Sequence, residues 1–310
     1  MNRLYIIGNG FDLYHGLPTS YKCFNCYVHR MFPKKHERIG RVFNRMDPNL
    51  LWSGYEEMLS KLDIARLVKN NIETWFNCTN IYDVENAFDT LYEDLMGLFH
   101  EWVLQIDYSL ANENRLALDR DAAFLNFNYT NTLEGLYGVR REQICYIHGD
   151  TGNNSLYKPV IGHGESSVES AIFPHIVDIC KIVNTYNKFP QWAQNSCEFM
   201  QVIVEIIKSF LCYLKKNTDY YIQENNDWFA RLCNKEDIYV LGHSLADVDA
   251  PYFKRVYNES PNATWHISCY GEKEKKNNKQ KLCDLLAVSQ KNINIELFEL
   301  DDLELKKENC

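Results

Sequence analysis

The chain begins with a short apolar run, residues 3–7, that stops abruptly at Gly8-Asn9-Gly10. A continuous apolar run ended by glycines is typical of a buried β-strand followed by a tight turn. Further runs of this kind occur at residues 122–127, 144–147, 160–161, 238–241, 264–269 and 293–298. The pattern therefore predicts central strands distributed along the whole chain.

Helical periodicity fills the segments between these runs. Apolar residues recur on one helical face in a stripe that includes Phe88, Leu95 and Trp102, and again in a stripe that includes Ile203 and Phe210. Shorter helical patterns at 247–257 and 274–287 alternate with the last strands. Alternating strands and helices indicate a parallel sheet covered by helices on both faces. We therefore expect a Rossmann-like α/β fold.

The lengths of these segments suggest how the chain is organised. A chain of 310 residues can form one large domain with insertions. Helical patterns dominate two long stretches, at about residues 22–118 and 168–233, and no repeat or low-complexity linker separates them from the rest. We expect a single α/β nucleotide-binding domain over residues 1–310 that carries these two helical insertions.

Charge and hydropathy narrow the classes of partner. The formal net charge of −9 disfavours binding to a polyanion, and the basic run at 273–281 is interleaved with Glu and Asn, as on a solvated helix face. No stretch approaches eighteen uninterrupted apolar residues, and the N-terminus lacks the pattern of a signal peptide. We expect a cytoplasmic protein with neither a membrane nor a nucleic acid as its partner.

The 11 cysteines show no regular pairing. An odd number of cysteines without a secretion signal suggests reduced thiols, which we expect to be mostly buried. Cys23 and Cys26 have the spacing of half a zinc site, but no second pair completes a set of four ligands. We therefore predict no metal.

The residues with the most suggestive chemistry follow predicted strands. In open parallel sheets, ligands bind beyond the carboxyl ends of the strands. We therefore expect the segments that follow the strands to converge on one crevice. They are Gly8-Asn9-Gly10, Asn126-Phe127-Asn128-Tyr129-Thr130, His148-Gly149, Gly162-His163-Gly164 and Gly242-His243-Ser244.

The first of these segments suits a phosphate group. Gly8 and Gly10 allow close approach of the backbone, and a helix that starts there would direct its N–H groups at a pyrophosphate. A dehydrogenase fingerprint needs a third glycine where this chain has Leu13, so hydride transfer is disfavoured. The alternative is that the glycines only make a turn.

The segment Gly242-His243-Ser244-Leu245-Ala246 imitates a hydrolase nucleophile elbow, with alanine in place of the last glycine. In that fold an acid and then a histidine follow the serine, but here only His266 follows, within a predicted strand. A serine hydrolase is therefore disfavoured. Ser244 suits a hydroxyl donor to phosphate or ribose at a helix N-terminus.

His148 and Asn128 are the candidate catalytic residues. His148 follows an apolar strand, where we expect it to be accessible to solvent and to act as a general base. The Asn128 carboxamide can orient a water or a ribose hydroxyl without competing for the proton. The alternative for His148 is a structural histidine with satisfied hydrogen bonds.

Several ordered motifs carry a family resemblance. The string from Ile6 to Tyr21, IIGNGFDLYHGLPTSY, resembles the AbiH family of bacterial phage abortive-infection proteins. The resemblance continues through motifs that span nearly the whole chain. They are Trp52 with Glu56, Phe127-Asn128-Tyr129-Thr130-Asn131-Thr132-Leu133-Glu134, Ile147-His148-Gly149, Ile161-Gly162-His163-Gly164 and Leu241-Gly242-His243-Ser244-Leu245.

The same series is more distantly similar to the sirtuin-type NAD-binding fold. This resemblance implies that Gly8 and Gly10 approach the NAD phosphates and that Asn128 and His148 lie beside the nicotinamide ribose. Gly242 and Ser244 would contact the adenosine side. The other expected nucleotide-binding residues are Asn9, Phe11, Asp12, Pro18, Thr19, His163 and His243.

Three departures from the sirtuin pattern bear on the chemistry. Thr130 stands where an acidic residue often follows the Asn-aromatic pair, and Ser20-Tyr21 replaces a Phe-Arg pair. The chain also supplies no four-cysteine zinc module, which disfavours deacylation. Simple hydrolysis of NAD is easier to support.

Together these observations predict an anti-phage effector that hydrolyses NAD to nicotinamide and ADP-ribose without a metal, with Asn128 and His148 as its catalytic residues. A homo-oligomer and a phage-derived trigger are the partners that such an effector would have. Two alternatives stay open. One is a module that senses ADP-ribose or a related nucleotide without turnover, and the other is a defence effector directed at nucleic acid.

Overall fold

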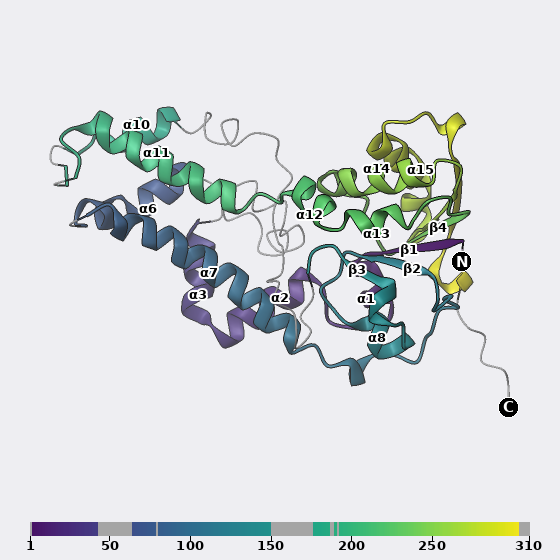
Figure 1. The fold of residues 1–310 in the computed structure, drawn as a ribbon. Helices are drawn as coiled ribbons and strands as arrows, with labels where there is room; N and C mark the ends of the chain where they lie inside the picture. The colour runs from purple at the N-terminus through teal and green to yellow at the C-terminus, as the bar shows by residue number, and fades with distance from the viewer. Residues whose placement is uncertain are drawn as a thin grey trace. The chain divides into compact units, whose positions relative to one another are not determined.

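The computed structural model describes residues 2–42, 64–78, 80–149, 176–186, 189–190 and 192–303 (Figure 1). The chain divides into two compact units. The first comprises Met1–Ser20, Val103–Val160 and Asn217–Cys310, and the second comprises Tyr21–Trp102 and Ile161–Lys216. The second unit thus consists of two separate segments of the chain. The sequence pattern predicts helical insertions in the same two regions, at about 22–118 and 168–233.

The first unit is built on a six-stranded sheet in which every neighbouring pair of strands is parallel. Its strand order is β3-β2-β1-β4-β5-β6. The strands are β1 Arg3–Ile7, β2 Ala123–Asn126, β3 Ile144–Tyr146, β4 Asp237–Leu241, β5 Thr264–Ser268 and β6 Asn294–Phe298. The Rossmann-like α/β fold is confirmed. The strand expected at 160–161 lies outside the described residues.

Both faces of the sheet are covered, as the continuous apolar strands predict. In β1, Leu4 and Ile6 belong to one buried cluster, while Tyr5 and Ile7 belong to the other. Residues of α1 (Asn9–Tyr14) and α8 (Thr132–Tyr137) join the second cluster. The first cluster includes residues of three helices, α13 (Asn226–Ala230), α14 (Ala250–Glu259) and α15 (Gly271–Leu286).

The strand order creates a switch point between β1 and β4. The chain runs outward from β1 through β2 to β3, and then returns to the other side of β1 for β4, β5 and β6. Ile7 pairs with Asn126 of β2 and with Leu241 of β4, so the three strands end at one level. In sheets of this order, ligands bind beyond the carboxyl ends at the switch point.

Short elements complete the first unit. The helix α12 (Thr218–Glu224) precedes α13. The 3-10 turns are η1 Tyr108–Leu110, η2 Arg141–Gln143, η4 Asp247–Asp249, η5 Gln290–Asn292 and η6 Leu300–Leu303.

The second unit is helical and is held together largely by aromatic side chains. Phe24 of α2 contacts Phe99 of α7 with ring centroids 5.3 Å apart, and Phe88 of α7 contacts Phe210 of α11 at 5.2 Å. The predicted stripes of α7 and α11 are therefore core, as expected. The helices are α2 Tyr21–Met31, α3 Pro33–Val42, α6 Ile64–Phe76, α7 Tyr82–Leu104, α10 Ile176–Val183 and α11 Ser196–Tyr213.

A groove of about 660 Å³ lies between α7 and α11. Phe88, Ile206 and Phe210 line it together with Glu85 and Asp89. None of the described residues that we expect to bind a nucleotide lines this groove.

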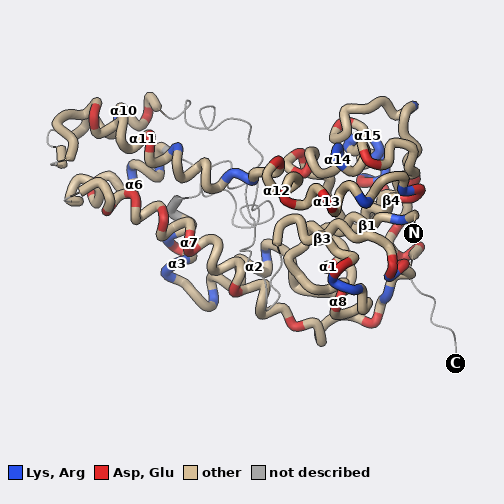
Figure 2. Tube along the Cα trace, in the orientation of Figure 1, with Lys and Arg blue, Asp and Glu red and all other residues tan. Residues whose placement is uncertain are grey.

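Charged residues of both signs are mixed along the described helices (Figure 2). The basic run expected to be a solvated face lies in α15, where Lys275 forms ion pairs with Glu272 at 3.5 Å and with Glu299 at 2.6 Å. Acidic partners therefore neutralise part of the run. Across the described ranges, no helix has both the length and the apolar character that a membrane span requires.

The expectation that the cysteines are mostly buried is wrong for the described residues. Cys145, Cys269 and Cys283 are buried, but other cysteines lie on exposed helix faces and ends. The exposed ones are Cys26, Cys197, Cys212 and Cys233. An amphipathic helix buries only one stripe, so a helical cysteine outside that stripe faces solvent, whereas Cys233 lies in the turn after α13.

Candidate functional site

The loops that follow β1 and β4 pack backbone against backbone. The Gly8 amide donates to the Leu241 carbonyl at 2.9 Å, and the Gly10 amide donates to the Gly242 carbonyl at 2.8 Å. A Cβ on Gly10 would lie 2.8 Å from the Gly242 Cα, and a Cβ on Gly242 would lie 2.2 Å from the Phe11 nitrogen. Gly242 also has φ +64°. Close approach of the two loops therefore requires glycine at these positions.

This packing affects how the first loop could bind a phosphate. The amides of Gly8 and Gly10 are already hydrogen-bonded, and the Phe11 amide donates to the Gly8 carbonyl at 2.9 Å. The Asn9 side chain donates to the Thr19 carbonyl at 3.0 Å. A phosphate at this turn would therefore be bound by other donors. The contact with the β4 loop explains the two glycines without a ligand.

Asn128 links the loop after β2 to the β1 loop. Its side-chain amide donates to the Gly8 carbonyl at 3.0 Å, and its backbone amide donates to the Asn126 side-chain oxygen at 3.0 Å. Asn128 is buried. The structure thus brings Asn128 next to Gly8, at the carboxyl ends of β1 and β2.

Asp12 of α1 is the buried acid of this site, with none of its surface exposed. The Thr130 hydroxyl donates to Asp12 Oδ2 at 2.5 Å, and the Thr132 hydroxyl donates to Thr130 at 3.1 Å. Burial raises the pKa of Asp12 to about 6, against the lowering effect of the Thr130, Thr132 and Asn128 side chains. Asp12 Oδ1 has no hydrogen-bond partner among the described residues.

A second polar centre joins the loops after β3 and β4. Asp249 lies between two histidines, with Oδ1 3.8 Å from His148 Nε2 and Oδ2 3.3 Å from His243 Nε2. The Leu245 amide donates to His243 Nδ1 at 3.0 Å. Nδ1 is therefore unprotonated, and Nε2 carries the hydrogen that faces Asp249. His243 thereby orients the carboxylate toward His148.

Aromatic rings enclose the His148–Asp249–His243 centre. The Phe127 ring centroid lies 5.2 Å from that of His148 and 4.5 Å from that of His243, and Tyr252 lies 5.8 Å from His148. His148 is only 3% exposed. The expectation that His148 is accessible to solvent is therefore wrong, because side chains from the loop after β2 and from α14 cover it.

The loop after β4 is not a nucleophile elbow. Ser244 is exposed, and α14 begins only at Ala250, after the turn η4. Ser244 therefore does not lie at a helix N-terminus, in contrast to the expectation. Leu245, although buried, has φ +54°, a conformation that costs a residue with a side chain about 1–2 kcal/mol. Strain of this kind is often kept at functional sites.

Two further histidines have structural roles. His266 lies on β5, where it faces Asp237 and Glu296 at 3.0 Å each and stacks on Tyr239. It is therefore not a partner for Ser244. His15 donates to the Phe11 carbonyl at 2.6 Å from Nδ1, and its Nε2 faces the Tyr137 hydroxyl at 2.5 Å. Burial lowers the pKa of His15, in agreement with a neutral ring.

The other residues expected to bind a nucleotide differ in their exposure to solvent. Phe11 is part of the buried core, and Thr19 is buried with its amide donating to the Leu17 carbonyl at 2.8 Å. Pro18 is exposed. His163 lies outside the described residues.

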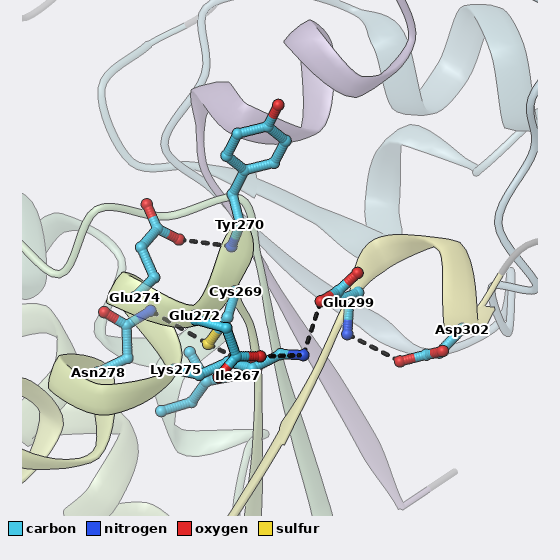
Figure 3. Close-up of polar contacts among 9 residues, drawn as sticks. All are labelled: Ile267, Cys269, Tyr270, Glu272, Glu274, Lys275, Asn278, Glu299 and Asp302. Atoms are coloured by element: carbon cyan, nitrogen blue, oxygen red, sulfur yellow. Dashed lines mark hydrogen bonds and ion pairs between the residues drawn. The ribbon is translucent and has the colours of Figure 1, made fainter.

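The carboxyl ends of β5 and β6 carry a cluster shown in Figure 3. Tyr270 follows β5, and its side chain is 91% exposed, although its backbone amide is held by Glu274 at 2.7 Å. Cys269 is buried beside it and accepts a hydrogen bond from Asn278 at 3.4 Å. Figure 3 shows the Tyr270 ring pointing away from the polar contacts of Glu274 and Lys275. A solvent-exposed aromatic ring at the carboxyl edge of the sheet is a surface on which a base can stack.

Sequence reasoning missed Asp249 and Tyr270. The segment 247–249 has the acids that commonly precede a helix, so nothing in the sequence distinguishes Asp249 from Asp247. Tyr270 follows a predicted strand, as the other candidates do. That position could have identified it as a candidate binding residue. In the part of the chain that the structure describes, no group of His, Cys, Asp and Glu side chains could hold a metal ion.

Fold and site together define an α/β protein of the Rossmann type with a polar centre at the switch point of its sheet. The family model described as Bacteriophage abortive infection AbiH matches residues 4–269. This match covers most of the chain, so the chain belongs to the AbiH family and has a role in phage abortive infection. No curated protein and no solved structure matches it.

Proposed function

We propose that this AbiH protein hydrolyses NAD to nicotinamide and ADP-ribose. The observation that carries the proposal is the His148–Asp249–His243 centre, which lies at the carboxyl edge of a sheet with the strand order of dinucleotide-binding proteins. A histidine oriented by a carboxylate is a common means of accepting a proton in hydrolysis.

The reaction can be assigned to groups of the chain. The bond between nicotinamide and the ribose carbon breaks with its electron pair moving to the ring nitrogen, so nicotinamide leaves as a neutral molecule. Water attacks the resulting oxocarbenium-like ribose and loses a proton to His148. The Asp249 carboxylate, 3.8 Å away, stabilises the protonated ring.

Other residues would bind the rest of the nucleotide. Asn128 lies beside Gly8 and is placed to orient the ribose or the water. On the far side of the switch point, the exposed Ser244 and the exposed ring of Tyr270 would contact the adenosine half. The amides of Gly8 and Gly10 are already hydrogen-bonded, so binding would depend on these side chains more than on the glycine turn.

The experiment is an incubation of the purified full chain with NAD, with and without a lysate of phage-infected cells as the source of a trigger. Released nicotinamide is quantified by chromatography. We expect release by the wild type and a reduction of about 10²- to 10⁴-fold in His148→Ala, the usual contribution of general acid–base catalysis. Equal release by the two proteins would reject the mechanism.

One observation favours a second candidate, a nucleotide sensor without turnover. His148 is 3% exposed, and its ring is enclosed by Phe127 and Tyr252. A buried histidine that pairs with a carboxylate can serve to couple the loops after β3 and β4 instead of reacting. Saturable binding of ADP-ribose, with nicotinamide release at background under every condition, would establish the sensor.

A further inference from the structure

Two buried polar atoms of the segment after β1 have no hydrogen-bond partner. They are Asp12 Oδ1 and Thr19 Oγ1, and neither has a donor or acceptor in the part of the chain that the structure describes. Leu17 links the two residues, because its amide donates to the Asp12 carbonyl at 3.1 Å and its carbonyl accepts from the Thr19 amide at 2.8 Å. One short segment thus holds an unsatisfied acceptor and an unsatisfied hydroxyl.

The two other buried aspartates of the described chain, Asp94 and Asp249, both face basic side chains, and Asp249 lies between two histidines. Asp94, 8% exposed, forms ion pairs with Lys35 at 3.0 Å and with Arg38. Asp12 has no such cationic partner among the described residues. The neutral side chains of Thr130, Thr132 and Asn128 lower its pKa, and the Thr130 hydroxyl donates to Oδ2, whereas Oδ1 has no donor there. A buried carboxylate oxygen without a donor is strongly unfavourable. Such a group is expected where a ligand supplies the missing hydrogen bond.

We propose that Asp12 is a specificity-determining residue that accepts a hydrogen bond from the carboxamide nitrogen of the substrate's nicotinamide. This inference rests on the proposed function. An ionised carboxylate only accepts hydrogen bonds, so its partner must carry an N–H or O–H donor. A carboxamide carries an N–H donor for Asp12 Oδ1 and a carbonyl acceptor for the Thr19 hydroxyl.

The position of Asp12 agrees with this assignment. Thr130 holds its Oδ2 from the loop after β2, and the same loop provides Asn128, which is bonded to Gly8. The carboxylate therefore lies at the carboxyl edge of β1 and β2, beside the residue proposed to orient the ribose. The loops after β1 and β2 would thus select the base and position the ribose at adjacent places in the site.

The test compares two ligands that differ at one group. NAD and nicotinic acid adenine dinucleotide are titrated calorimetrically into the full chain, because the second ligand replaces the carboxamide by a carboxylate that would face Asp12. The variants are Asp12→Asn and, as a matched control, Asp237→Asn at the opposite end of the sheet. Thermal melting of each protein at pH 7.5 is measured alongside.

We expect the wild type and Asp237→Asn to bind NAD at least about 10-fold more tightly than the acid analogue. Asp12→Asn should weaken NAD binding by about 10- to 100-fold, the effect of losing a charged hydrogen bond, and should abolish the preference. It should melt no lower than the wild type, because the carboxylate has no ion pair to lose.

Three results would overturn the inference. If Asp12→Asn keeps the preference of the wild type, Asp12 does not select the base, although the NAD site stands. If Asp12→Asn melts well below the wild type, the carboxylate is structural. If the wild type binds neither dinucleotide, both the inference and the proposed function fail. If the wild type binds NAD with this preference but releases no nicotinamide, the proposed hydrolysis fails while the role of Asp12 in base selection stands.

Discussion

Gly10 donates a 2.8 Å hydrogen bond to the carbonyl of Gly242, and this contact joins the loops of β1 and β4 at the switch point of the sheet. The two loops belong to segments far apart in the chain, yet each excludes a Cβ from the other. The contact thereby fixes the position of Asn128, which is bonded to Gly8, relative to His243 in the β4 loop.

The first prediction concerns this contact. Gly242→Ala should lower the free energy of unfolding by more than about 3 kcal/mol, because its Cβ would lie 2.2 Å from the Phe11 nitrogen and its φ is +64°. Gly138 has the same φ of +64° but nothing within 4 Å of a Cβ. Gly138→Ala should therefore cost only about 1–2 kcal/mol in denaturant unfolding. Equal losses would show that the loops are not in contact.

The second prediction separates Asp249 from its neighbour. Asp249→Asn should reduce nicotinamide release by about 10²- to 10⁴-fold, because a neutral amide cannot stabilise a protonated His148. Asp247 lies in the same turn but is exposed, so Asp247→Asn should retain wild-type turnover. The pH dependence of release should also change in Asp249→Asn. A merely structural Asp249 would alter the amount of folded protein without moving that profile.

The third prediction follows from the pKa of Asp12. Its folded value of about 6 lies above the ordinary 3.8, so the folded chain binds this proton more tightly than the unfolded chain does. Stability from this group is complete below about pH 4 and is lost as the pH rises through 6, a decrease of about 3 kcal/mol. Asp12→Asn should remove that decrease.

Unfolding of both proteins between pH 4 and 7.5 would measure this effect. The other ionisable groups near Asp12 are Tyr108, Glu134 and His15, and all are present in both proteins. The difference between the two curves therefore reports Asp12 alone. A difference that stays constant with pH would contradict the prediction.

The fourth prediction concerns Tyr270. Its ring is 91% exposed, so Tyr270→Ala should leave the melting temperature unchanged. It should weaken NAD binding by about 5- to 150-fold, as expected for the loss of one base–aromatic stack of about 1–3 kcal/mol. Tyr270→Phe should bind like the wild type. Tyr82→Ala, which removes a 69% exposed ring in the helical unit, is the matched control and should have no effect.

Much of the fold could be predicted because its strands are continuous apolar runs. Residues 3–7 form β1 with the predicted bounds, and the other described strands begin within a residue of the predicted start. The rule that parallel strands share a carboxyl edge also predicted that Asn128 would lie near Gly8, as the structure shows. Both inferences depend on local pattern and on general sheet geometry.

What could not be predicted depends on contacts between distant segments. The occupied amides of Gly8 and Gly10 result from the β4 loop, more than 200 residues away in the chain. The burial of His148 results from the ring of Phe127, in the loop after β2, and from that of Tyr252 in α14. Its pairing with Asp249 requires the turn η4 to meet the loop after β3. Spacing in the sequence contains none of these relationships.

The central claim is that this AbiH protein cleaves NAD at the His148–Asp249 pair. The most direct test measures nicotinamide and ADP-ribose after incubation of NAD with the wild type, His148→Ala and Asp247→Asn, each with and without the lysate of infected cells. We predict equimolar products from the wild type and Asp247→Asn, and a reduction of at least about 100-fold in His148→Ala. Products at background in every protein, or equal products from the wild type and His148→Ala, would contradict it.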